Sequence, residues 1–445
     1  MPDQLTGEVT ELLQALIRNQ CVNDGSVESG HEDRSADILT SVLEGPGIDV
    51  QRYEPEPGRA SVVARIEGSN PEAPSLLLMG HTDVVPVSPE RWRHDPFGGE
   101  LIDGEVWGRG AVDMLNLTAS MAVATRKLAD EGFGPEGTLI YLGVADEEAL
   151  GTHGAQWLTE HVPEVVGADY VLTESGGMPT QTPGGMKLPL IVAEKGSFWC
   201  TLRVTGTPGH GSQSYKVDNA LVKAAEVVRR VSSFRPETRI HETWTGFLAG
   251  IGFPEEMTAP LSDPDTFLEA LDAYPDAMAR LFHACTHTSV NPTIIRGGSK
   301  VNVVPDAVEI DLDIRIVPSE TEEDVRRMLD EAIGDLADSV ELIVRSSEPP
   351  SASPVDTPLY ESLQRLVPRW YEGSSVVPML TVGATDARFF RWLGMTAYGF
   401  GLFSQKMSYE DYSVMFHGDD ERVDQDSLRL STELWQAVAT DLLSS

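Results

Sequence analysis

The segment Leu76-Leu77-Leu78-Met79-Gly80-His81-Thr82-Asp83 decides the fold. Its apolar run predicts a buried strand, and the glycine marks the carboxyl end of that strand. His81 and Asp83 follow, two residues apart. A metal-ligating imidazole needs its second nitrogen held by a carboxylate or a carbonyl, so His81 as ligand and Asp83 as its orienting group fit together. A polar loop with a solvated histidine is the plain alternative.

The sequence on either side of this segment alternates between predicted strands and predicted helices. Strand-like runs occupy residues 61–66, 75–79, 138–144 and 170–173. Helical patterns occupy residues 8–18, 115–130 and 154–161. This alternation predicts an α/β fold with a mostly parallel sheet covered by helices. Functional side chains in such folds gather in the loops at the carboxyl ends of the strands.

A different pattern begins after residue 194. Residues 306–318 alternate apolar and acidic side chains, which predicts a strand with one buried and one wet face. We expect a further strand at 198–205, helices at 218–232 and 321–337, and a proline-rich return linker at 346–358. The chain is therefore predicted to form a catalytic domain from residues 1–194 and 347–445, including helices at 359–370 and 427–443. The intervening residues 195–346 are predicted to form an inserted α+β domain. Residues 235–295, rich in proline and aromatic side chains, are interpreted as an insertion within that small domain.

Acidic residues and a second histidine follow other predicted elements. Asp113 ends a glycine-rich turn before a helix, Asp146-Glu147-Glu148 follows one strand, Glu174 follows another, and His417 lies far downstream. Each has an ordinary alternative, such as a helix cap for Asp113 or an exposed acidic turn for the three consecutive acids. Together they supply imidazole and carboxylate ligands in ordered loops. Such a set without thiolates suits zinc, with manganese or cobalt as competitors.

Composition restricts the class of partner. The 445 residues include 33 Lys plus Arg and 70 Asp plus Glu, for a net charge of −37. A surface this acidic repels phosphates and anionic lipids, so neither nucleic acid nor a membrane surface is expected as a partner. No apolar run approaches the ~18 residues needed to span a bilayer. Three scattered cysteines exclude a disulfide framework, and the N-terminal residues lack a signal pattern, so we expect a cytoplasmic enzyme.

Five motifs, in order along nearly the whole chain, carry a resemblance to a known family. They are Gly80-His81-Thr82-Asp83, Gly108-Arg109-Gly110-Ala111-Val112-Asp113-Met114, Asp146-Glu147-Glu148, Glu174, and His417-Gly418 followed by Glu421. On these motifs the chain resembles the two-zinc metallopeptidase and amidohydrolase family of aminoacylase, glutamate carboxypeptidase, carboxypeptidase S, acetylornithine deacetylase and succinyl-diaminopimelate desuccinylase. The resemblance implies a zinc-exopeptidase-like catalytic domain with an inserted lid or dimerisation domain.

The resemblance also implies a set of metal ligands. His81, Asp113 and Glu174 would hold one ion, and Asp113, Glu148 and His417 would hold the other. Asp113 would therefore bridge two Zn²⁺ per chain, with Co²⁺ or Mn²⁺ as possible replacements. In this family a cis peptide typically follows the bridging aspartate, so one is expected between Asp113 and Met114.

Catalytic roles are implied for three further residues. Glu147 would be the general base that takes a proton from the attacking water, and Asp83 would orient His81. The segment Gly206-Thr207-Pro208-Gly209-His210-Gly211-Ser212 resembles the family's lid segment, in which a histidine reaches the partner subunit's active site. His210 would thus complete the site of the other chain in a homodimer.

Substrate-binding roles are implied for Asn302, Arg315 and Arg388, which match the family's asparagine and arginines. Arg388 would grip a substrate carboxylate, a task that suits a planar guanidinium. The expected function is hydrolysis of an amide or peptide bond next to a free carboxylate, of the carboxypeptidase or dipeptidase type, on a small peptide. Deacylation of N-acyl amino acids by an aminoacylase is the first alternative. A non-catalytic binding protein on the same fold is a more remote one.

Overall fold

The computed structural model describes residues 3–444 and is built around a ten-stranded sheet. Its main strand order is β1-β2-β6-β3-β7-β18-β9-β16, and β8 and β17 also pair with β9. The four central strands β6, β3, β7 and β18 are parallel, whereas β2 and β9 run antiparallel to their central neighbours. The strands are β1 (Asp49–Tyr53), β2 (Ser61–Ile66), β3 (Leu76–His81), β6 (Leu139–Val144), β7 (Tyr170–Thr173), β8 (Thr180–Thr182), β9 (Gly185–Glu194), β16 (Ser351–Ala352), β17 (Ser375–Thr381) and β18 (Thr396–Gly399).

Helices cover both faces of this sheet because its central strands are apolar on both sides. Leu76 and Leu78 of β3 belong to one core, and Leu77 and Met79 belong to the core on the opposite face. The first core is closed by α1 (Gln4–Arg18), α2 (Asp33–Leu43), α3 (Leu115–Asp130), α12 (Pro358–Leu366) and α15 (Gln425–Leu443). The second is closed by α4 (Ala155–His161), α5 (Pro163–Val166) and α13 (Ala387–Trp392). The predicted α/β class with a mostly parallel, helix-covered sheet is confirmed.

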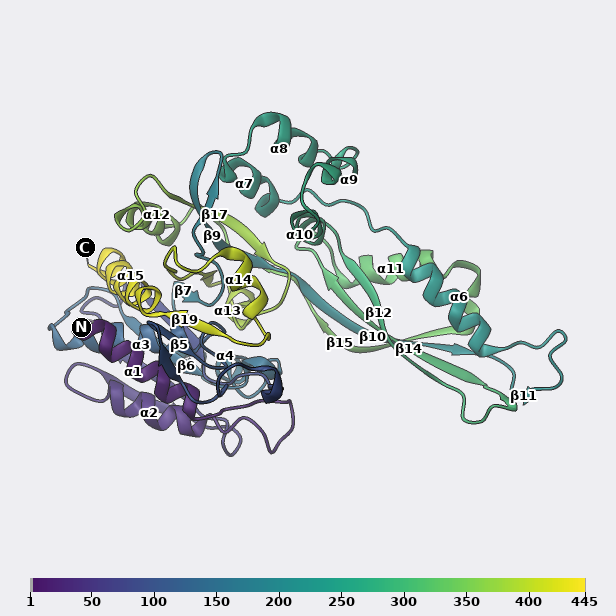
Figure 1. Ribbon diagram of the computed structural model, residues 1–445, viewed down its shortest axis with the longest axis horizontal. Coiled ribbons are helices and arrows are strands. Elements are labelled where there is room, and N and C mark those ends of the chain that lie inside the picture. The colour runs from purple at the N-terminus through teal and green to yellow at the C-terminus, as the bar shows by residue number, and fades with distance from the viewer. Residues whose placement is uncertain (1–2, 445) are drawn as a thin grey trace.

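A smaller antiparallel sheet extends away from the large one (Figure 1). Its strand order is β12-β14-β10-β15, and the expected alternation along β14 is present: Val308, Ile310 and Leu312 are buried against two helices. These elements are β10 (Gly196–Thr205), β12 (Ser289–Gly297), β14 (Ala307–Ile316), β15 (Val340–Glu348), α6 (Ala220–Ser233) and α11 (Glu322–Ile333). A short two-stranded antiparallel sheet of β11 (Gly209–His210) and β13 (Val303–Val304) lies at the far end of this sheet (Figure 1).

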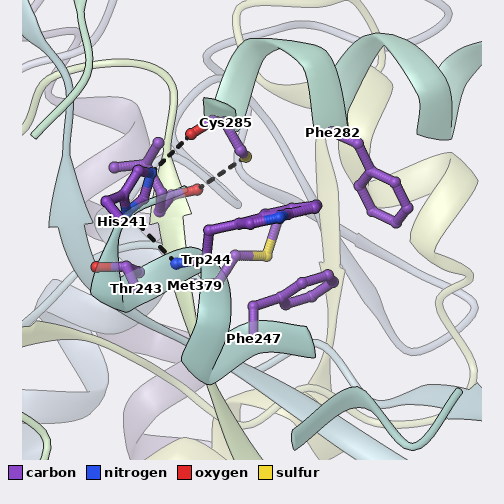
Figure 2. Close-up of a pocket in the computed structure, with 8 residues that line it drawn as sticks. His241, Thr243, Trp244, Phe247, Phe282, Cys285 and Met379 are labelled. Carbon is purple, nitrogen blue, oxygen red and sulfur yellow. Dashed lines mark hydrogen bonds between the residues drawn. The ribbon is translucent and has the colours of Figure 1, made fainter. Parts of the chain in front are cut away.

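The helices between α6 and β12 contribute to the core of the large sheet rather than to that of the small one, and the first of them packs directly on β17. They are α7 (Glu242–Ile251), α8 (Glu255–Leu261), α9 (Phe267–Ala270) and α10 (Asp276–Thr286). Trp244, Phe247 and Phe282 join the core of the large sheet and lie beside Met379 of β17 (Figure 2). Within residues 235–295, the helical part 242–286 therefore differs from its interpretation as an insertion within the small domain, because its aromatic side chains join the core of the large sheet. Residues 289–295 belong to β12 of the small sheet.

The chain also contains another small sheet and a further short helix. A three-stranded sheet is formed by β4 (Glu100–Ile102), β5 (Glu105–Trp107) and β19 (Arg422–Asp424), and α14 (Tyr409–Met415) precedes His417. Within residues 3–444, no helix has both the length and the apolar character needed to cross a membrane.

Candidate active site

The site forms where the parallel strands β6, β3 and β7 end side by side. Because these strands share one direction, their carboxyl ends meet at one edge of the sheet. His81 ends β3, Glu147 and Glu148 follow β6 in a short 3-10 turn, and Glu174 follows β7. Gly80 lets α3 approach this edge, since a Cβ on it would lie 2.4 Å from the Thr118 hydroxyl. Topology thus gathers side chains that are far apart in sequence.

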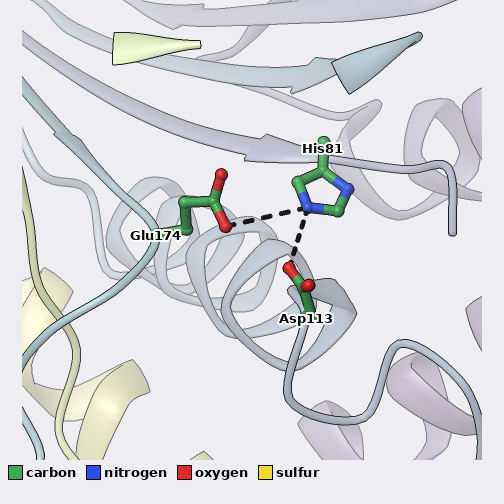
Figure 3. A group of neighbouring side chains, drawn as sticks. All are labelled: His81, Asp113 and Glu174. Carbon is green, nitrogen blue, oxygen red and sulfur yellow. Dashed lines mark hydrogen bonds and ion pairs between the residues drawn. The ribbon is translucent and has the colours of Figure 1, made fainter. Parts of the chain in front are cut away.

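The first candidate ligand group contains His81, Asp113 and Glu174 (Figure 3). His81 Nε2 lies 3.3 Å from Asp113 Oδ1 and 3.9 Å from Glu174 Oε2. Donor atoms bound about 2.1 Å from one tetrahedral ion are about 3.4 Å apart, so these spacings fit a shared cation. All three residues are buried.

The second candidate group contains Asp113, Glu148 and His417. His417 Nε2 lies 3.3 Å from Asp113 Oδ2 and 3.2 Å from Glu148 Oε2. The two oxygens of Asp113 therefore face different imidazoles, as a bridging carboxylate requires. The expected cis peptide between Asp113 and Met114 is present.

Local electrostatics favour a cation at this place. Burial, and then the neighbouring Glu174 carboxylate, raises the pKa of Glu147 well above its ordinary value. Burial likewise raises the pKa of Glu174, while hydrogen bonds with Asp113 and Glu148 raise the pKa of His417 to about 10. In addition, Glu148 Oε1 is buried without a hydrogen-bond partner among the described residues. Buried carboxylates crowded in this way need positive charge, so the imidazole and carboxylate set fits divalent ions such as Zn²⁺.

His81 is held by the backbone of Asp83 rather than mainly by its carboxylate. His81 Nδ1 lies 2.9 Å from the Asp83 carbonyl oxygen and 3.6 Å from the carboxylate. A proton on Nδ1 donated to that carbonyl leaves the lone pair of Nε2 directed at Asp113 and Glu174. The orienting residue is the predicted one, but the shorter contact comes from an atom that sequence reasoning did not choose.

The Asp83 carboxylate instead fixes the loop that carries the candidate base. It accepts the backbone N–H groups of Glu147 at 3.2 Å and Glu148 at 3.0 Å. Asn23 Nδ2 donates to the same carboxylate at 2.9 Å and to Asp146 at 3.1 Å. Arg59 is buried beside them, 3.5 Å from the Asp146 carboxylate. Asn23 and Arg59, which the sequence did not single out, therefore help to position this loop.

Glu421 does the same for the loop that carries Asp113. One of its oxygens accepts the backbone N–H groups of Val112 and Asp113 at 2.6 and 2.8 Å. The other accepts from the backbone of Gly110 and from the guanidinium of Arg109, each at 2.9 Å. Burial raises the pKa of Glu421 to about 7. The motif contained Glu421, but its position alone did not indicate this role.

A cleft of about 500 Å³ is lined by Glu147 and by every member of the two ligand groups except His81. Arg315 and Arg388 also line it, so the structure brings these two predicted substrate-binding residues to the site. Arg315 Nε donates to Asp313 at 2.8 Å. The Arg388 guanidinium is buried and donates to the carbonyls of Thr385 at 2.7 Å and Leu150 at 2.9 Å.

His210 and Asn302 are not brought to this cleft within one chain. Both are exposed and lie at the two-stranded β11–β13 sheet, at the end of the small sheet farthest from the large sheet (Figure 1). His210 Nδ1 lies 2.8 Å from the Ser212 hydroxyl and accepts the backbone N–H of Ser212 at 3.2 Å, both of them local contacts. Within one chain, the predicted metal ligands, Arg315 and Arg388 thus lie together, whereas His210 and Asn302 lie at the far end of the small sheet.

The sequence of this chain is similar to those of known metallopeptidases and aminoacylases. The family model for "Peptidase family M20/M25/M40" matches residues 77–441. The chain is 26% identical over 411 residues to aminoacylase-1 of Mus musculus, covering 89% of this chain and 87% of that protein. It is 28% identical over 396 residues to an N-fatty-acyl-amino acid synthase/hydrolase of Xenopus tropicalis, covering 85% of this chain and 74% of that protein.

Solved structures share the fold. An M20 family metallo-carboxypeptidase from Sulfolobus solfataricus superposes with a TM-score of 0.71 at 18% identity, covering 99% of each chain. Human carnosine dipeptidase 1 gives a TM-score of 0.67 at 15% identity, covering 99% of this chain and 97% of that one. Because the family model matches most of this chain, the chain belongs to peptidase family M20/M25/M40 and is a metal-dependent hydrolase of amide or peptide bonds.

Proposed function

We propose that the chain hydrolyses the amide or peptide bond next to a free carboxylate, as a carboxypeptidase or dipeptidase. The observation that carries this proposal is one cleft that is lined by members of both candidate ligand groups, by Glu147 and by the buried Arg388. Such a cleft offers a hydrolytic centre and a fixed positive group for a substrate carboxylate.

Two Zn²⁺ per chain are the proposed cofactors, with Co²⁺ or Mn²⁺ as substitutes. His81, Asp113 and Glu174 would hold one ion, and Asp113, Glu148 and His417 the other. When bound, the ions would supply Lewis acidity that polarises the scissile carbonyl and acidifies the attacking water.

Glu147 is proposed as the group that moves protons. Its raised pKa suits a carboxylate that accepts a proton from water and then donates it to the leaving amine. Its backbone N–H is fixed by Asp83, so the side chain starts from a defined position beside the ligands. Arg388 and Arg315 would align the carboxylate end of the substrate.

Aminoacylase action on N-acyl amino acids is the second candidate. The similarity to aminoacylase-1 over 89% of this chain favours it. Both activities place an amide bond at the same centre and a carboxylate on the same arginine, and they differ in the acyl group. Assays of dipeptides and N-acyl amino acids, each with zinc, cobalt and manganese, separate the two.

Arg388→Ala is expected to raise KM for substrates with a free α-carboxylate roughly 10- to 100-fold, since a charge-assisted hydrogen bond is worth about 1.5–3 kcal/mol. Substrates with an amidated carboxyl terminus should be poor for the wild type and little affected further. Steady-state kinetics on matched acid and amide pairs measures this. Arg388→Lys is the charge-conserving control. Thermal unfolding of both variants shows whether loss of the hydrogen bonds to the Thr385 and Leu150 carbonyls lowers stability. A wild type that prefers amides would contradict the proposal.

Metal-loaded protein is expected to hold close to two equivalents of divalent ion per chain. His417→Ala should hold about one, because His417 contacts only the second group, whereas Asp113→Ala should lose affinity for both. Elemental analysis after dialysis measures the stoichiometry without reference to activity. A wild-type value that stays at one equivalent is incompatible with a bridging Asp113.

A homodimer in the cytoplasm completes the proposal. The segments next to β11 and β13 carry exposed apolar side chains, including Tyr215 and Val301. A second copy would bury them and would use His210 and Asn302 from across the interface. Cys21, Cys200 and Cys285 are all free, which supports a reducing compartment.

We propose that residues 1–194 and 347–445 form the catalytic domain and that residues 195–346 contain the inserted domain. The small sheet has its own apolar core with α6 and α11. The segment α7–α10 contributes to the core of the large sheet, so we assign it to the catalytic unit.

A further inference from the structure

A carboxylate of the protein itself lies against the guanidinium that we assign to the substrate carboxylate. Glu348 ends β15 and lines the same cleft as the ligand groups. Its Oε2 is 3.2 Å from Arg388 Nε, and Ser197 Oγ lies 3.4 Å from the same oxygen. The side chain of Arg388 is only 4% exposed and that of Glu348 is 21% exposed.

The rest of Arg388 is fixed, so the Nε edge is the part that can change partners. Its two terminal nitrogens donate to the carbonyls of Thr385 and Leu150. The Nε–H is buried and makes no well-directed hydrogen bond among the described residues, although Glu348 is close. A guanidinium has five N–H donors in a fixed fork, and an incoming carboxylate with better geometry can take the donor that Glu348 leaves unsatisfied.

Glu348 and Arg388 also belong to different layers of the molecule. Glu348 lies on the small sheet, opposite Ser197 in the β10–β15 register, and precedes Pro349 and Pro350 on the return to the large sheet. Arg388 lies on α13, which packs on the large sheet. The ion pair therefore spans the two parts of the chain at their junction.

We propose that Glu348 is a specificity-determining residue that competes with the substrate carboxylate for Arg388. This inference rests on the proposed function. A substrate carboxylate bound to Arg388 lies beside a like charge, so it must displace Glu348 or accept the repulsion. The competition weakens binding of the acidic substrate and of the amino acid product alike, and it favours product release.

Glu348→Gln removes the competing charge while keeping the shape of the side chain. We expect it to lower KM for a dipeptide with a free carboxyl terminus roughly tenfold and to tighten inhibition by the product amino acid by a similar factor. KM for the matched dipeptide amide should not change. Glu348→Ser removes the same charge and replaces Glu348→Gln in the test if the latter is poorly soluble.

Glu341→Gln is the matched control. Glu341 lies on the same strand, is 61% exposed, and pairs with Arg203 at 3.8 Å rather than with a residue of the cleft. Glu341→Gln removes the same charge as Glu348→Gln. It should leave KM for the acid, KM for the amide and inhibition by the product amino acid unchanged. The competition between Glu348 and the substrate carboxylate is overturned if KM for the acid is unchanged or raised in the Glu348 variants while the wild type still prefers acid over amide. A wild type without that preference overturns the proposed function itself, whatever Glu348 does.

Discussion

Glu147→Ala is expected to lower kcat by about 10²–10⁴-fold, the usual range for loss of a general base. The protein should retain both metal equivalents. The expectation follows from two neighbouring acids with different surroundings. Glu148 faces His417 at 3.2 Å and belongs to a ligand group, whereas Glu147 belongs to neither group and has a strongly raised pKa. The measurement combines steady-state kinetics with elemental analysis of the same preparation.

Glu148→Ala is the matched comparison, since it removes the same side chain from the adjacent position. It should lose one metal equivalent as well as activity. Near-normal kcat in Glu147→Ala, or metal loss from it, would show that the roles of the two acids are exchanged. Glu147→Gln keeps the volume of the side chain and separates loss of the proton acceptor from loss of packing.

Mixing inactive His210→Ala and Glu147→Ala proteins is expected to restore activity to roughly a quarter of wild type. His210 lies in β11, at the end of the small sheet far from the cleft, so we expect it to serve the cleft of a partner chain in a dimer. In a mixed dimer, one site keeps its own Glu147 and receives the partner's His210, and the other site carries both defects. Random exchange makes about half of the dimers mixed, and half of their sites are intact.

The experiment requires proof that subunits exchange, for example by mass spectrometry of differently tagged chains. If His210 acted within its own chain, every site would carry one defect and mixing would restore nothing. Mixing either variant with a double His210→Ala, Glu147→Ala chain is the control, because neither mixture can form an intact site. Recovery in that control would contradict the shared site.

The sequence predicted those parts of the site that follow from strand ends. Parallel strands place His81, Glu147 and Glu174 at one edge whatever the details of packing, so their order along the chain was sufficient. Asn23 was missed as a positioning residue because its partners are the carboxylates of Asp83 and Asp146, far away in sequence. Glu421 was missed because it mainly accepts backbone N–H groups of a distant loop. No periodicity encodes such contacts, since any buried amide or carboxylate could make them.

The assignment of residues 235–295 differed for a related reason. Helical and aromatic patterns show that a segment has an apolar face, but they do not show which sheet covers that face. Trp244 and Phe247 could have closed either core. Glu348 was likewise read only as part of a proline-rich linker, because its pairing with Arg388 depends on how the two parts of the chain are oriented.

The packing of α7 and α10 on β17 has a consequence for dissecting the protein. A fragment cut at residues 195 and 346 would carry Trp244, Phe247 and Phe282 away from the strand that buries them. It would expose a continuous aromatic face to water and would aggregate, while the remaining pieces would bare the matching surface of β17. To express the small sheet by itself, residues 235–288 would have to be replaced by a short polar loop. The small sheet therefore cannot be isolated by two cuts in the chain alone.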